Sequence, residues 1–325
     1  MRHAGMLPTR TKISGDVASM AVSSQASGTS GATYLMCPAD HFKVSYSINP
    51  WMEPKAWAGD PSFLHRRAKQ QWDDLVATLT SAGASVHTMA PDHGVPDLVF
   101  AANAAVVLDR KVLLSRFRHP ERRREEPVYG AALNELYATG LFDELVPVPE
   151  DVVLEGAGDC IWDPVRQLFW MGYGFRSEIS AAAFVERTFG ARGVPLELRD
   201  PRFYHLDTAL CALPCGGVLH YPGAFTPLAL EILYAEVAPE DRLALDESEA
   251  CAFAANAVAF GRAIVMSTCS IRLCRVLEER GYAVLQTPLD AFLRSGGSAC
   301  CLTLRLDHRS AVASIDLQQS PSSTA

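Results

Sequence analysis

The feature that most constrains this chain is a tetrapeptide that occurs twice, Phe-Ala-Ala-Asn at residues 100–103 and again at residues 253–256. After each copy come two short apolar runs joined by a two-residue turn, Asp109-Arg110 in the first case and Gly261-Arg262 in the second. Apolar runs separated by such a turn predict a β-hairpin. One local motif is therefore expected to recur along the chain.

Other segments repeat this pattern with helices between them. Further hairpins are expected at Leu154–Asp163 with Gln167–Tyr173 and at Leu206–Leu213 with Val218–Tyr221. Helices are expected at Phe63–Ala82, Glu126–Thr139, Ser177–Phe189, Leu228–Tyr234 and Thr268–Arg280, and lone strands at Ala84–Met89, Val194–Leu198 and Tyr282–Thr287. Such units bury their apolar faces only against one another, around a common axis. The sequence thus predicts one α/β domain, a five-bladed pseudo-symmetric propeller of ββαβ-type repeats with a period of roughly fifty residues.

Composition sets the boundaries of this domain. Residues 1–31 are rich in Ser, Gly, Ala and Thr and lack a signal-peptide hydrophobic segment, so we expect a disordered tail there. The folded domain is expected to span 32–310, beginning with a strand at Thr33–Met36, and residues 311–325 are expected to form a second disordered tail. No apolar run approaches the length of a membrane span.

Charge and cysteine content narrow the function classes. A net charge of −8 without a dense basic block argues against a nucleic-acid partner, and the one basic cluster, residues 116–124, is interleaved with glutamates and has the composition of a solvated loop. The nine cysteines have no zinc-pair spacing, and the histidines form no HExxH motif. We therefore expect reduced thiols in a cytoplasmic protein, with no membrane partner.

Polar residues gather where each expected hairpin begins. They are Asp97, Asn103, Glu155, Asp159, His205, Asp207, Asn256 and finally Cys301. If the units are related by pseudo-rotation, these positions meet at one end of the axis and share a pocket.

Three of these residues form a set suited to nucleophilic catalysis. In such a set a thiolate attacks, an imidazole moves protons and a carboxylate orients the ring, and the candidates are Cys301, His205 and Glu155. Cys301 follows the glycine-rich stretch 295–300 and opens a strand-like alternation over 302–306, while His205 and Asp207 are expected on one face of a strand. Each has a plain alternative: a buried small hydrophobe, a structural histidine and a turn residue.

Longer motifs resemble a known superfamily. Glu155-Gly156-Ala157-Gly158-Asp159, residues 203–208 (FYHLDT) and Gly296-Gly297 to Cys301 are similar to the signature of the guanidino-group-modifying superfamily, which includes arginine deiminases, dimethylarginine dimethylaminohydrolases and amidinotransferases. Four further motifs resemble arginine dihydrolases, at residues 47–53, 96–100, 172–178 and 221–225. The resemblance covers about residues 33–308 and implies the five-bladed propeller known as the pentein fold.

The resemblance also implies roles for individual residues. Cys301 would be the nucleophile, His205 the general acid and base, and Glu155 the residue that orients it. Asp207 would bind the guanidinium. The resemblance further implies that Arg176 and either Arg116 or Arg118 would bind the substrate carboxylate. Asp97 would meet the α-amino end of the substrate, and the loop residue Asn49 would hold the substrate or close over it. Cys300 is expected to be structural.

Asn103 departs from the deiminase pattern, which has an aspartate there. A carboxylate only accepts hydrogen bonds, whereas an amide can also donate one to the carbonyl oxygen of a neutral ureido group. The expected function is therefore a cysteine-dependent L-arginine dihydrolase that needs no cofactor and no metal, acts on a small-molecule substrate and can form a homo-oligomer. The alternatives are an arginine deiminase or dimethylarginine dimethylaminohydrolase that stops at citrulline, an amidinotransferase, and a non-catalytic arginine-binding protein.

Overall fold

The predicted hairpins fold as antiparallel strand pairs. In the first, β3 (Ala105–Leu108) pairs with β4 (Lys111–Leu114), and the turn residues Asp109 and Arg110 have φ angles of 52° and 64°. Both angles lie in the left-handed region that a two-residue hairpin turn requires. The other pairs are β6 (Cys160–Asp163) with β7 (Leu168–Tyr173), β9 (Leu210–Ala212) with β10 (Val218–His220), and β12 (Val258–Phe260) with β13 (Ala263–Met266).

A third strand joins each pair in parallel, and the described part of the chain, residues 31–311, contains five three-stranded sheets of one pattern. The added strands are β5 (Glu144–Val146), β8 (Arg192–Glu197), β11 (Arg242–Ala244) and β14 (Ala283–Gln286). In the fifth sheet β1 (Thr33–Met36) pairs antiparallel with β15 (Leu304–Arg305) and parallel with β2 (Ser85–Thr88). The segment after Cys301 therefore completes the first unit of the chain.

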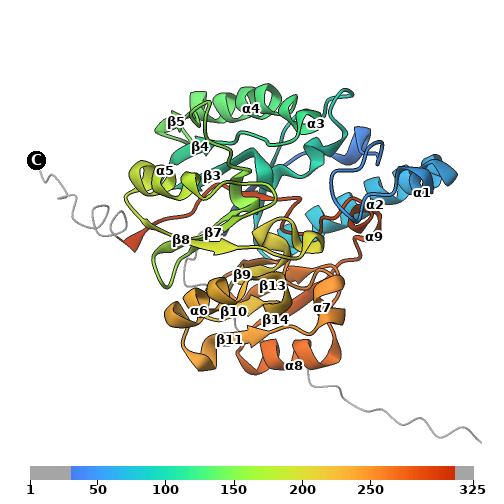
Figure 1. Cartoon of the computed structure of the whole chain (residues 1–325). Coiled ribbons are helices and arrows are strands. Elements are labelled where there is room, and N and C mark those ends of the chain that lie inside the picture. The colour runs from blue at the N-terminus through green and yellow to red at the C-terminus, as the bar shows by residue number, and fades with distance from the viewer. Residues whose placement is uncertain (1–30, 312–325) are drawn as a thin grey trace, which may run out of the picture. The chain divides into compact units, whose positions relative to one another are not determined.

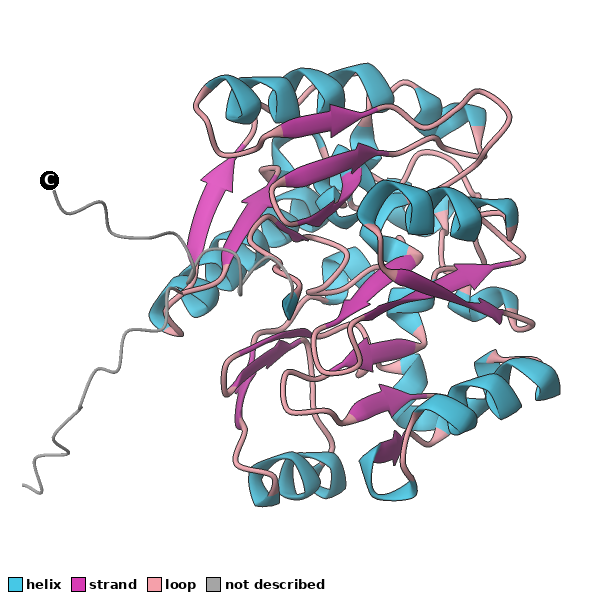
Figure 2. Cartoon of the chain, turned by 90° about the vertical axis from the view of Figure 1, so that its left-hand side faces the viewer, coloured by secondary structure: helices cyan, strands magenta, loops and turns pink. Residues whose placement is uncertain are grey.

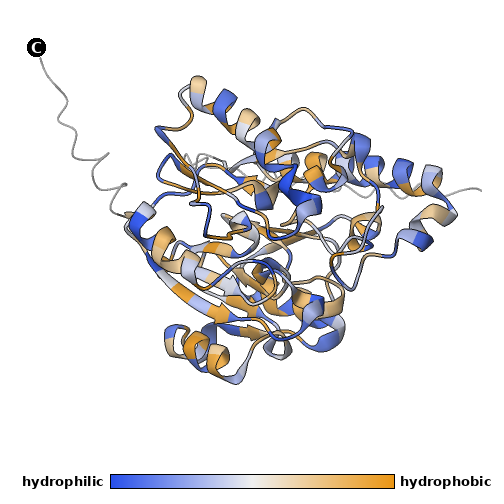
Figure 3. Cartoon of the chain, turned by 45° about the horizontal axis from the view of Figure 1, so that its top comes forward, coloured by the Kyte–Doolittle hydropathy of each residue, from blue (hydrophilic) through white to orange (hydrophobic). Residues whose placement is uncertain are grey.

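Helices cover the outer sides of the sheets (Figures 1 and 2). They are α1 (Pro54–Gly59), α2 (Pro61–Ser81), α3 (Pro120–Arg123), α4 (Glu126–Ala138), α5 (Ser180–Phe189), α6 (Pro227–Glu236), α7 (Glu247–Cys251), α8 (Ile271–Glu279) and α9 (Asp290–Leu293). The helices visible in Figure 3 contain both hydrophobic and hydrophilic residues, as expected for helices with one apolar face. In α2, for example, Leu64, Ala68, Leu75 and Leu79 are buried.

Two local predictions are wrong at the start of strands. Residues 206–208 form a 3-10 helix, so His205 and Asp207 do not alternate along a strand, and β9 begins only at Leu210. The expected strand over 302–306 is limited to Leu304–Arg305. In both places the chain turns tightly before it pairs, and side chains of the turns contact distant segments: His205 contacts Glu155, and Cys301 contacts Asp207.

The structure is a computed structural model that describes residues 31–311. The predicted tails, 1–31 and 311–325, lie outside the described residues except for residues 31 and 311 themselves. Within residues 31–311, no helix has both the length and the apolar character needed to cross a membrane.

Candidate active site

The site is built from the short turns that precede the first strand of the sheets. The 3-10 helices Pro96–Val99 and Ala101–Ala104 precede β3, Gly156–Gly158 precedes β6, and Leu206–Thr208 precedes β9. Six of the predicted residues line one small cavity: Asn49, Asp97, Asn103, Arg176, His205 and Cys301. Glu155 and Asp207 lie directly behind this lining, in contact with His205 and Cys301 respectively.

His205 is held by a buried carboxylate. Its Nε2 lies 2.7 Å from Glu155 Oε2, and Arg176 donates to the same oxygen at 3.0 Å. All three side chains are at most 2% exposed. Burial alone would raise the pKa of Glu155, but the charges of Arg176 and His205 outweigh it and hold this pKa well below its ordinary value. Glu155 is therefore ionised and fixes the orientation of the imidazole.

Cys301 faces a second carboxylate. Its Sγ donates to Asp207 Oδ2 at 3.1 Å, and Asp207 Oδ1 has no hydrogen-bond partner. Burial raises the pKa of Asp207 to about 7, and burial together with Asp207 raises the pKa of the Cys301 thiol. A cation placed against Asp207 would reverse the second effect, because it would favour both the carboxylate and the thiolate.

Asn103 lines the same cavity with a fixed amide orientation. Its Nδ2 donates to the Glu155 carbonyl at 3.0 Å, and its Oδ1 accepts from Arg122 Nη1 at 2.8 Å. Arg122 is itself held by Glu125 through two hydrogen bonds of 2.9 and 2.7 Å. Glu125 holds the pKa of Arg122 above its ordinary value against the opposing effect of burial.

Asp97 and Asn49 complete the lining. Asp97 Oδ2 accepts from the Tyr46 hydroxyl at 2.7 Å, and burial raises the pKa of Asp97. Asn49 donates to the Ser295 carbonyl at 3.0 Å and accepts from the Trp51 amide, which attaches the loop before α1 to the stretch that leads to Cys301.

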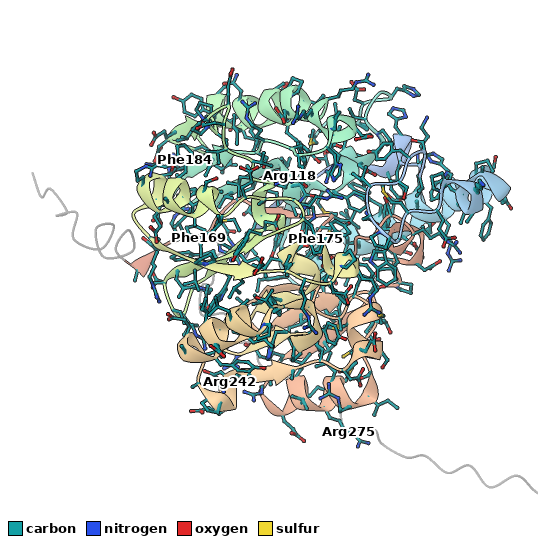
Figure 4. The ribbon with its side chains drawn as sticks, in the orientation of Figure 1. Arg118, Phe169, Phe175, Phe184, Arg242 and Arg275 are labelled. Atoms are coloured by element: carbon teal, nitrogen blue, oxygen red, sulfur yellow. The ribbon has the colours of Figure 1, made fainter. Side chains whose placement is uncertain are left out.

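Two predicted arginines do not line this cavity. Arg118 (labelled in Figure 4) directs its guanidinium to the Arg176 carbonyl and to Glu178, while its backbone amide donates to Glu155 Oε1 at 3.1 Å. Arg116 contributes a backbone bridge to Leu154. The arginine of the basic cluster that does line the cavity is Arg122, which is 3% exposed, so the expectation of a solvated loop is wrong there.

Asn256 was expected among the polar residues that meet at the pocket, but without a role of its own. In the structure its side chain contacts Cys301 directly. Tyr204 is a further group that was not predicted individually. Tyr204 carries Arg176 on its ring face at 4.5 Å and donates to the Gly296 carbonyl at 2.8 Å. Across residues 31–311, no three His, Cys, Asp or Glu side chains cluster as metal ligands would.

A family model and individual relatives of this chain point to the same protein family. The model of the eukaryotic N,N-dimethylarginine dimethylhydrolase family matches residues 52–226. The bifunctional arginine dihydrolase/ornithine cyclodeaminase ArgZ of Synechocystis is 42% identical over 272 residues, which are 84% of this chain and 37% of that protein. The N(G),N(G)-dimethylarginine dimethylaminohydrolase of Mycobacterium tuberculosis is 35% identical over 273 residues, 84% of this chain and 85% of that protein.

Solved structures agree. One is the crystal structure of the substrate-bound N-terminal domain of ArgZ, which is an arginine dihydrolase. Its sequence is 39% identical to this chain, the TM-score is 0.79, and the match covers 86% of this chain and 99% of that domain. The chain spans less than two fifths of the length of the two bifunctional relatives, 37% and 38%. Because the family model matches more than half of the chain and the mycobacterial relative is covered almost throughout, the chain belongs to the dimethylarginine dimethylaminohydrolase family of the guanidino-group-modifying superfamily.

Proposed function

We propose that this protein is an L-arginine dihydrolase, which converts arginine and two waters to ornithine, two ammonia and carbon dioxide. The observation that carries the proposal is the neutral amide of Asn103 in a cavity that also contains a cysteine, a histidine and two acidic groups behind them. The similarity to ArgZ, whose N-terminal domain is described as an arginine dihydrolase, supports the same reaction.

In the proposed first step Asp207 binds the substrate guanidinium beside the thiol. The Cys301 thiolate attacks the guanidinium carbon, and His205 gives a proton to the departing ammonia. Water activated by His205 then hydrolyses the covalent intermediate to a ureido product. Glu155 keeps the imidazole oriented, which fits the 2.7 Å contact between them.

In the second step the ureido product is attacked again. Loss of the second ammonia leaves the ornithine nitrogen joined to the Cys301 sulphur through one carbonyl carbon. Hydrolysis of this carbamoyl-enzyme species by the second water releases ornithine and carbon dioxide. The Asn103 Nδ2 has a second hydrogen besides the one given to the Glu155 carbonyl, and this hydrogen can be donated to the ureido oxygen. An aspartate at this position could only repel that oxygen.

Other polar residues of the cavity lining suit the amino-acid end of the substrate. Arg122 and Arg176 bring two buried guanidinium groups, which suit a carboxylate, and Asp97 suits an α-ammonium group. The cavity is narrow, with room for roughly one water, and the loop that contains Asn49 forms part of its wall.

We also infer that the five sheets are the blades of a closed propeller over residues 32–310. Two observations support this arrangement: β1 pairs with β15, and the first strands of all the sheets contribute to a second cavity, of about 110 Å³. Its walls include Tyr34, Val107, Ile161, Leu210, Val258 and Leu304. A shared axial cavity is what a ring of blades produces. The nine free cysteines support the predicted cytoplasmic location.

Product analysis by mass spectrometry tests the function. Arginine and citrulline are supplied separately, and we expect ornithine from both; Asn103→Asp should stop at citrulline. Accumulation of citrulline by the parent would refute the dihydrolase proposal. The second candidate, favoured by the family model, is removal of a methylated amine from dimethylarginine, and the same product analysis detects this reaction when dimethylarginine is supplied as a third substrate. Binding of arginine without turnover by the parent would indicate a non-catalytic protein.

A further inference from the structure

The second Phe-Ala-Ala-Asn tetrapeptide has no part in the function proposed above, although its asparagine lies at the nucleophile. The two asparagines of the repeat have different surroundings. Asn103 faces the substrate cavity and Arg122, whereas Asn256 is completely buried and does not line the cavity. Its side chain is surrounded by the turn that carries Cys301.

All four hydrogen-bonding positions of the Asn256 amide that the structure describes are directed at this turn or at Asp207. Its Oδ1 accepts from the backbone amides of Ser298 at 3.0 Å and Cys301 at 3.2 Å. Its Nδ2 donates to the Asp207 carbonyl at 3.0 Å and to Cys301 Sγ at 3.1 Å. One side chain therefore contacts both the backbone and the sulphur of the nucleophile.

The orientation of this amide is determined by its neighbours. The two groups that face Oδ1 are backbone N–H donors, and one group that faces Nδ2 is a backbone carbonyl acceptor. A flipped amide would place donor against donor and acceptor against acceptor at all three positions. The group directed at the sulphur is consequently an N–H donor.

The backbone that carries Asn256 is also constrained. Phe253, the first residue of the tetrapeptide, has a φ of 59°, a conformation that is uncommon for a residue with a large side chain. Its ring is fully buried and packs edge-on against Trp51 at 5.0 Å. Strained backbone of this kind persists only where the surrounding packing imposes it, and here that packing holds Asn256 against the turn.

We infer that Asn256 is a positioning residue, whose amide fixes the turn of Cys301 and stabilises the thiolate by donating a hydrogen bond to the sulphur. The inference rests on Cys301 as the nucleophile of the proposed function. A hydrogen bond to a charged acceptor favours the charged form, so removal of the donor raises the pKa of the thiol.

Several charged or titratable groups surround the sulphur. Asp207 touches it, His205 and Arg176 line the same cavity, and the Cys300 thiol precedes it in the chain. Burial and Asp207 raise the pKa of the thiol, whereas the Ser298 backbone and Asn256 lower it. Asn256 is thus a side chain whose effect on the thiol opposes that of Asp207.

The test is the pH dependence of Cys301 alkylation by iodoacetamide, with the modified residue identified by peptide mass spectrometry. We expect Asn256→Ala to raise the apparent pKa of Cys301 by about one unit, a roughly tenfold loss of thiolate below that pKa. The isosteric Asn256→Asp keeps the two acceptor contacts but replaces the donor with a negative charge, and should raise the pKa further. Ser298→Ala is the matched control, because its buried hydroxyl has no hydrogen-bond partner and its removal should leave the pKa unchanged.

Each outcome decides the inference. Folded Asn256→Ala and Asn256→Asp proteins with the parental alkylation profile would overturn it, and so would loss of folding in both variants, since Asn256 would then serve the architecture alone. A raised thiol pKa in either folded variant supports it. Alkylation needs no turnover, so the result stands whether or not the protein releases ornithine from arginine.

Discussion

Glu155→Gln should destabilise the protein more than almost any other change of a single charge. Glu155 is fully buried and accepts from Arg176 at 3.0 Å, from His205 at 2.7 Å and from the Arg118 backbone at 3.1 Å. The glutamine keeps the shape but leaves the Arg176 charge buried without its carboxylate partner, although Arg176 keeps its contacts with the Ile48 carbonyl and the Tyr204 ring. Removal of one partner of a buried pair costs about 3–5 kcal/mol, a large part of the roughly 5–15 kcal/mol that stabilises a typical domain.

The chain offers a matched control for this experiment. Glu178 also pairs with an arginine, Arg118, but at 3.4 Å and with both side chains more than a third exposed. Exposed pairs contribute about 0–1 kcal/mol, so Glu178→Gln should have little effect. Equilibrium urea unfolding followed by circular dichroism measures both variants. Equal free energies of unfolding for the two would refute the reasoning that Glu155 is the ionised centre of a buried network.

The pH dependence of the same measurement has a definite sign. The pKa of Glu155 is lower in the folded protein than the value of about 4.3 expected after unfolding. Its contribution is therefore fully present above about pH 4 and is lost as the pH falls toward the folded-state pKa. The difference between the parent and Glu155→Gln should be constant from pH 5 to 8 and should decrease in more acidic solution.

Three further predictions concern other parts of the molecule. Asp207→Asn should raise the free energy of unfolding by more than about 1 kcal/mol at pH 8 but not at pH 4. The pKa of Asp207 is about 7 in the folded protein, so this carboxyl destabilises the native state once the pH rises above the pKa that it has in the unfolded chain. Urea unfolding at the two pH values measures the effect. Arg122→Lys should raise the KM for arginine by at least roughly tenfold, because lysine lacks the guanidinium group that donates hydrogen bonds to both Glu125 and Asn103. An unchanged KM in steady-state kinetics would contradict this prediction. Leu75→Ala should lower the free energy of unfolding by about 2–5 kcal/mol and Ile271→Ala by less than about 0.5 kcal/mol, because the Leu75 side chain is fully buried in α2 and the Ile271 side chain is exposed. Equal effects of the two variants in thermal unfolding would refute this assignment of the core.

The sheets were predictable from the sequence because their signals are local. Alternation of apolar residues and a turn at Asp109-Arg110 depend on neighbouring residues alone, and the hairpin at β3 and β4 is confirmed within a few residues. The short strands β5 and β11 were missed, because they have few apolar residues and exist through parallel pairing with a distant hairpin. Fold class and repeat pattern follow from local periodicity, whereas the length of each strand does not.

The cavity itself was less predictable. Asp97 lies in a 3-10 segment, and Glu155 and His205 each directly precede one. The strand face expected for His205 and Asp207 was therefore wrong, even though His205 does reach the cavity. Arg122 has the local sequence of a solvated charge cluster. Its burial depends on Glu125 three residues later and on Asn103 nineteen residues earlier, and the second contact is a property of the fold.

The two proposed steps should depend on Asn256 to different extents. Arginine brings a positive charge to Asp207 and the sulphur, and this charge favours the thiolate on its own. Citrulline is neutral, so in the second step the donors to the sulphur are those of the protein, the Asn256 Nδ2 among them. Asn256→Ala should therefore lower kcat for citrulline more than kcat for arginine, and citrulline should accumulate during turnover of arginine. If both substrates lose the same factor, the substrate charge does not stabilise the thiolate, and Asp207 must have a different role from the one proposed here.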